Sequence, residues 1–67
     1  MKGYDNKKHQ RFSDECAAAG LDVENYRGRC FYEGPAVRTD DRQAVIRATT
    51  VPLQWDNMGK GWIVYPC

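Results

Sequence analysis

The chain has 67 residues, 42% of them hydrophobic and 28% charged, which indicates one small globular domain rather than a disordered segment. Ten basic and nine acidic residues give a net charge of +1, which argues against nucleic-acid binding through the overall field. No run approaches the roughly 20 apolar residues of a membrane helix, and residues 1–9 lack the apolar core of a signal peptide. We therefore expect a cytoplasmic protein in which residues 1–67 form a single domain.

The first predicted element is a helix from about residue 6 to Ala19. Phe12 and Cys16 recur at helical spacing with Ala19, so that the three form one apolar face. A start at residues 13–15 is the alternative, and it would leave residues 1–10 as a mobile basic arm.

The middle of the chain predicts a strand, a turn and a second helix. The strand covers residues 26–32, and the glycine and proline of residues 33–35 indicate a turn. Thr39 is predicted to cap a helix over residues 40–48. Its alanines and Val45 would face the sheet, whereas Ile46 would point elsewhere.

The last part of the chain predicts a β-hairpin. Residues 51–56 alternate between apolar and polar, and residues 62–67 are apolar on both faces, which favours a central position for the last strand. A two-residue turn at Gly59-Lys60 would place Trp55 opposite Val64. A longer loop would give a different register. In both registers Trp55, Trp62 and Val64 share one face.

Together these elements predict an α+β fold in the order helix, strand, helix, strand, strand. The strand-helix-strand unit favours parallel pairing of its two strands. We expect a three-stranded sheet with both helices on one face and the other face partly open.

Three blocks, residues 26–37, 51–59 and 62–66, resemble a small uncharacterised family of bacterial single-domain proteins, with cyanobacteria as a candidate source. The resemblance spans residues 13–67. It implies a compact cytosolic domain, and it brings no known activity and no functional residue with it.

The residues that could bind a metal or form a disulfide are widely spaced. Structural zinc sites usually bring ligands in close pairs, which His9, Cys16, Cys30 and Cys67 do not form. Three cysteines are also an odd number, so we expect free thiols, with Cys16 and Cys30 in the core. No metal or other cofactor is predicted.

No catalytic constellation is apparent either. The single histidine lies in a lysine-flanked segment, where a solvated position on a helix is expected. Asp40 and Asp41 are explained as first-turn charges that complement the helix dipole. We therefore expect a protein that is not an enzyme.

Binding is the remaining class, and we expect it on the open face of the sheet and its arginine and aromatic fringe. The favoured partner is another protein or a second copy of the chain, because apolar surface rimmed by arginine commonly marks a protein contact. The alternative is a nucleic acid, since arginine beside aromatic rings suits phosphate contact and base stacking. The candidate binding residues are Arg27, Arg29, Tyr32, Arg42, Ile46, Gln54, Ile63 and Tyr65.

Overall fold

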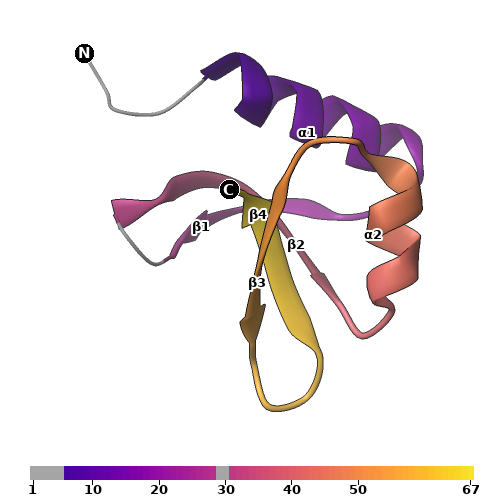
Figure 1. Ribbon diagram of the computed structural model, residues 1–67, viewed down its shortest axis with the longest axis vertical. Helices are drawn as coiled ribbons and strands as arrows, with labels where there is room; N and C mark the ends of the chain where they lie inside the picture. Colours follow the sequence, from indigo (N-terminus) through magenta and orange to yellow (C-terminus); the bar gives the residue numbers. More distant parts are fainter. Residues whose placement is uncertain (1–5, 29–30) are drawn as a thin grey trace.

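The computed structural model describes residues 6–28 and 31–67, which form two helices and a four-stranded antiparallel sheet (Figure 1). In chain order the elements are α1 (Asn6–Ala18), β1 (Val23–Arg27), β2 (Glu33–Thr39), α2 (Arg42–Ala48), β3 (Leu53–Asn57) and β4 (Trp62–Pro66). The spatial order of the strands is β1-β2-β4-β3. The predicted α+β class is confirmed, whereas the prediction of three strands is wrong.

The error lies in the segment between the two helices. Residues 26–32 were predicted as one strand, but β1 ends at Arg27 and β2 begins at Glu33. The amide of Gly28 donates to the carbonyl of Tyr32 at 2.9 Å, which closes the loop between these strands. Gly34 and Pro35, which were predicted as a turn, lie inside β2 opposite β1.

The strand-helix-strand unit is split by another strand. β2 and β3 both pair antiparallel with β4, so they run in the same direction without touching each other. The predicted parallel orientation is therefore present, but direct parallel pairing is not. The central position predicted for the last strand is confirmed, because β4 lies between β2 and β3.

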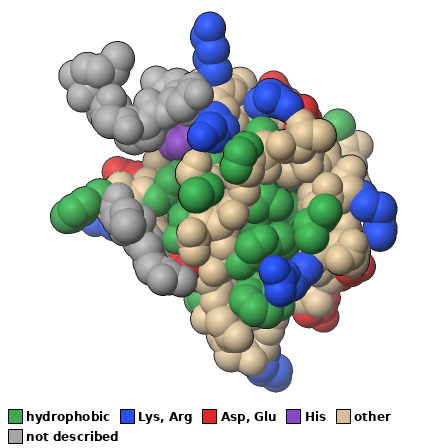
Figure 2. Space-filling model, viewed as in Figure 1, with side chains coloured by type: hydrophobic (Ala, Val, Ile, Leu, Met, Phe, Trp, Pro, Cys, Tyr) green, Lys and Arg blue, Asp and Glu red, His purple; other side chains and the backbone are tan. Residues whose placement is uncertain are grey.

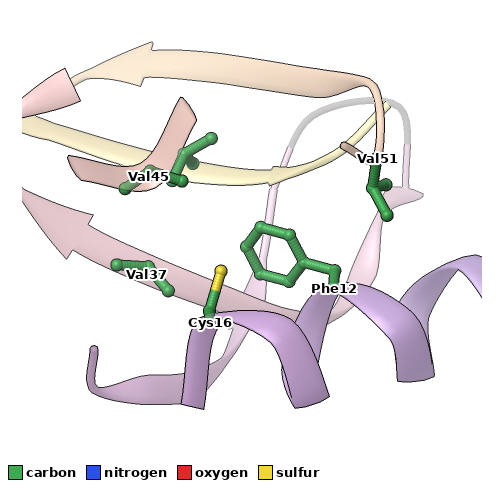
Figure 3. Close-up of a cluster of buried hydrophobic side chains, with 6 residues drawn as sticks. Phe12, Cys16, Val37, Val45 and Val51 are labelled. Carbon is green, nitrogen blue, oxygen red and sulfur yellow. The ribbon is translucent and has the colours of Figure 1, made fainter. Parts of the chain in front are cut away.

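The main core lies between the helices and one face of the sheet (Figure 3). Its six buried members are Phe12, Cys16, Val37, Val45, Val51 and Val64. Ala19, which was predicted on the apolar face of α1, is exposed because the helix ends at Ala18. Gly20 then takes a positive φ of 85°, and the amide of Leu21 donates to the carbonyl of Cys16, a common glycine-terminated helix end.

Residues 6–10 belong to α1, so the later start of this helix is excluded. Residues 1–5 of the predicted basic arm lie outside the described residues.

Asp41, rather than Thr39, caps α2. Its carboxylate accepts a hydrogen bond from the amide of Ala44, and the helix begins two residues later than predicted. The hydroxyl of Thr39 instead accepts from the amide of Asp41 at 2.9 Å, which holds the cap residue in place. Val45 is buried and Ile46 is exposed, as predicted.

The register of the β3–β4 hairpin is the one that a two-residue turn at Gly59-Lys60 requires. Trp55 pairs with Val64, and the amide of Met58 donates to the carbonyl of Gly61 at 3.0 Å. Gly59 has a φ of 86°, which the first position of a type II′ turn demands. Trp55, Trp62 and Val64 consequently share the face that carries the helices.

Candidate interaction surface

The face of the sheet away from the helices carries a second core rather than an open surface. Ala36, Ile63 and Tyr65 are buried there, with Tyr26 and Tyr32 packed against them. The rings of Tyr32 and Tyr65 stack with centroids 4.5 Å apart, and Tyr26 lies 5.5 Å from Tyr65. We call Tyr26, Tyr32 and Tyr65 the tyrosine cluster.

This packing corrects the expected exposure of two candidate binding residues. Ile63 is 0% and Tyr65 is 2% exposed, so neither can contact a partner in this conformation. Tyr32 is partly buried, and its hydroxyl donates to the carbonyl of Pro35 at 2.6 Å. The ring of His9, from α1, lies 5.1 Å from that of Tyr32, so the histidine packs against the cluster.

Of the other three candidates from this region, the structure describes Arg27 and Gln54, and each makes a contact within the chain. Arg27, at the end of β1, forms an exposed ion pair with Glu33 at 3.5 Å. Gln54 is partly buried on β3, where its side-chain amide lies 3.4 Å from the carbonyl of Trp55. Arg29 lies outside the described residues.

Arg42, at the start of α2, comes together with both tryptophans beside the edge strand β3, and Ile46 follows it one turn later on the helix. The guanidinium carbon of Arg42 lies 4.7 Å from the ring centroid of Trp55 and 4.6 Å from that of Trp62. The two indoles meet edge to face at 6.2 Å, with an angle of 84° between their planes. We call Arg42, Ile46, Trp55 and Trp62 the Arg42 patch.

The local sequence explains how these side chains meet. Trp55 and Trp62 both project from the helix-bearing face, because Trp55 pairs with Val64 and side chains alternate along β4. α2 begins at Arg42, so this residue lies at the start of the helix, and Ile46 follows one turn later on the same side. Because α2 has only seven residues and β3 is an edge strand, the tryptophans stay partly exposed.

The exposure and charges of this region suit intermolecular contact. Ile46 is 45% exposed, and Arg42 is exposed although it stacks on two rings. Figure 2 shows hydrophobic side chains gathered over the centre of one face of the molecule, with lysine and arginine side chains around them. Such a combination of aromatic residues and arginine is typical of the centre of protein interfaces.

The sequence predicted Arg42 and Ile46 as surface residues but missed the tryptophans as their neighbours. The alternation of side chains along the strands placed Trp55 and Trp62 on one face, where we expected them to anchor the helices rather than to form a contact surface. The signal that could have found the surface was the shortness of the second helix together with the edge position that Pro52 indicates.

Two further findings concern metals and membranes. Among residues 6–28 and 31–67, no three His, Cys, Asp or Glu side chains gather as a metal site would require. Within the same ranges, no helix is both long enough and apolar enough to cross a membrane.

No protein family model matches the chain, and neither a curated protein nor a solved structure is significantly similar to it.

Proposed function

We propose that this chain is a non-enzymatic protein-binding domain whose contact surface is the Arg42 patch. The observation that carries the proposal is the stacking of one exposed arginine on two partly exposed tryptophans, with an exposed isoleucine one helical turn after the arginine. Tryptophan and arginine dominate the binding energy of protein interfaces, particularly where a rigid arrangement keeps the entropy cost of binding low.

Nucleic-acid binding, the alternative, has less support from the same surface. Asp40 and Asp41 directly precede Arg42, and their charges would repel a phosphate backbone. Arg27 pairs with Glu33 and Arg38 with Glu24, so these guanidinium groups are partly neutralised. The rings of the tyrosine cluster pack on one another and leave little area for a base to stack on.

The proposal retains the cytoplasmic setting expected from the sequence. In such a reducing compartment Cys16 and Cys67 would remain thiols, and both are free in the structure.

The proposal is tested by capture of proteins from a lysate of the source organism with tagged wild-type protein and two variants. Ile46→Glu places a charge in the Arg42 patch, and Arg47→Glu changes the next residue, which makes no cation–π contact with either tryptophan among the described residues. Quantitative mass spectrometry should show proteins that are retained by the wild type and by Arg47→Glu but lost with Ile46→Glu. Equal retention by both variants would contradict the proposed surface.

Salt dependence separates the two kinds of partner. Binding to a nucleic acid would weaken steeply as salt rises from about 50 to 200 mM, because phosphate contacts release counterions. Capture through the Arg42 patch should weaken much less in this range, because protein contacts release no condensed counterions of a phosphate backbone. Salt-sensitive binding to nucleic acid that Ile46→Glu leaves intact would favour the alternative.

A further inference from the structure

The guanidinium group of Arg42 is held in place by two indole rings, but it pairs with no carboxylate among the described residues. Arg11, Arg27 and Arg38 each form an ion pair with a glutamate, whereas Arg42 and its helix neighbour Arg47 form none among the described residues; of these two, only Arg42 is held by ring contacts. Arg42 contacts only the two indole rings among the side-chain interactions of residues 6–28 and 31–67. Its N–H donors are therefore available to a bound molecule, and stacking lowers the entropy cost of ordering them.

Asp40 supplies an exposed carboxylate two residues before Arg42 in the chain. Its Cβ lies 3.5 Å from the position that a Cβ on Gly61 would take, and Gly61 directly precedes Trp62. Asp41 differs because its carboxylate caps α2. Among the described residues Asp40 has no ion pair and no side-chain hydrogen bond. The carboxylate of Asp40 and the guanidinium of Arg42 are thus two opposite charges, two residues apart, that do not pair with each other.

A surface that carries one unpaired positive and one unpaired negative group can pair with an identical surface on a second copy of the chain. In a two-fold symmetric contact the same patch faces its own copy, so that a contact of one residue with another occurs twice. Arg42 of one protomer could then meet Asp40 of the partner subunit, and the reverse contact would follow by symmetry. The exposed parts of Ile46 and Trp62 would lie between the two ion pairs and be removed from water.

From these observations we infer that the Arg42 patch binds a second copy of the chain, with two reciprocal ion pairs between Arg42 and Asp40. The inference rests on the proposed protein-binding function and names the partner. A chain of 67 residues also gains from such a contact, since a small domain hides only about 60% of its unfolded surface on folding.

The experiment measures mass by sedimentation equilibrium in a reducing buffer, which prevents a disulfide through Cys67. The wild type should approach twice its monomer mass of 7.7 kDa at roughly 100 µM. Arg42→Asp and Asp40→Arg should each weaken dimerisation at least about tenfold, because each brings like charges together at both contacts. Circular dichroism establishes that both variants are folded.

Mixing the two variants supplies the decisive control. In the mixture each contact again joins opposite charges, so the heterodimer should form, and the double variant Arg42→Asp/Asp40→Arg should dimerise with itself. A general loss of stability could not produce this rescue. Dimerisation of the single variants as strong as that of the wild type, or no rescue on mixing, would overturn the inference.

A monomeric wild type at roughly 100 µM would also overturn it, whatever the fate of the proposed function. If lysate proteins still bind in an Ile46-dependent manner, the proposed function stands with a different partner. If neither dimerisation nor such capture is observed, both fail.

Discussion

The hydroxyl of Tyr65 donates a hydrogen bond to Oδ2 of Asp56 at 2.8 Å, and both residues are buried on neighbouring strands. This bond joins β4 to β3 on the face of the sheet away from the helices. Replacing Tyr65 by phenylalanine keeps the ring of the tyrosine cluster but removes a donor from a buried carboxyl group. We expect a loss of about 1–2 kcal/mol in the free energy of unfolding, measured by urea denaturation.

The matched control for this change is Tyr26→Phe, in the same cluster. The hydroxyl of Tyr26 makes no hydrogen bond among the described residues, so its removal should change the free energy of unfolding by less than about 0.5 kcal/mol. Equal effects of the two substitutions would show that the Tyr65–Asp56 bond contributes no specific stability.

Gly28 should not tolerate a side chain, because the tyrosine cluster occupies the space beside it. A Cβ at this position would lie 2.8 Å from the ring of Tyr65 and 2.9 Å from that of Tyr26. Gly28→Ala is therefore expected to lower the free energy of unfolding by about 1–3 kcal/mol in thermal or urea denaturation. Gly28 does not have a positive φ, so alanine fits its backbone conformation. Without the clash, Gly28→Ala would stabilise the protein by about 0.4–1 kcal/mol, because alanine restricts the unfolded chain more than glycine does. Observed stabilisation would therefore contradict the packing argument.

Glu15 links α1 to the segment after α2 and should make stability depend on acid pH. Its carboxylate accepts hydrogen bonds from the hydroxyl of Thr49 at 2.6 Å and from the amide of Thr50 at 3.3 Å. The Thr49 bond is the main cause that lowers the pKa of Glu15 below 4.5 in the folded state. This contribution is therefore present above pH 4.5 and is lost as the pH falls through the lower folded value.

Glu15→Gln and Thr49→Val should each flatten the dependence of the unfolding free energy on pH below about pH 5, measured by urea denaturation at a series of pH values. Asp14→Asn is the control, because Asp14 bonds only the side chain of Gln10 at the surface and should leave the slope nearly unchanged. An unchanged slope in Glu15→Gln would refute the assigned role.

The sequence was sufficient to predict elements whose signals are local. The apolar spacing of Phe12 and Cys16 correctly identified the first helix, and of the two hairpin registers left open, the one that the turn glycine Gly59 suits, with Trp55 opposite Val64, is present. In both cases the residues that determine the structure lie within a few positions of one another.

The β1–β2 region could not be predicted in this way, because its determinants are distant in sequence. A Cβ at Gly34 would lie 2.9 Å from a ring nitrogen of His9, so close packing against α1, rather than a turn, explains this glycine. Burial of Ile63 likewise depends on tyrosines from β1 and the loop after it. The Arg42 patch was predicted only in part, since the extent to which α2 covers Trp55 and Trp62 is set by tertiary packing.

Cys16 should be almost inert in the folded protein. It is 0% exposed, and burial, with a smaller contribution from the charge of Glu15, raises the pKa of its thiol to about 11. Because the thiolate is the reactive form, its alkylation by iodoacetamide at pH 8 should be at least about a hundredfold slower than that of exposed Cys67. Site-resolved mass spectrometry measures both rates in one sample, and equal rates would contradict the buried position.

Arg42 should contribute to the stability of the monomer as well as to binding. Arg42→Ala removes a cation from the faces of Trp55 and Trp62, and this should lower the free energy of unfolding by about 0.5–2 kcal/mol. Arg47→Ala is the matched control, since it removes the same exposed side chain type from the same helix without a ring contact. Tryptophan fluorescence during urea denaturation, at protein concentrations low enough to exclude self-association, measures both changes. If the two substitutions cost the same, the stacking of Arg42 adds nothing to the fold, and the patch would have to be ordered by other contacts.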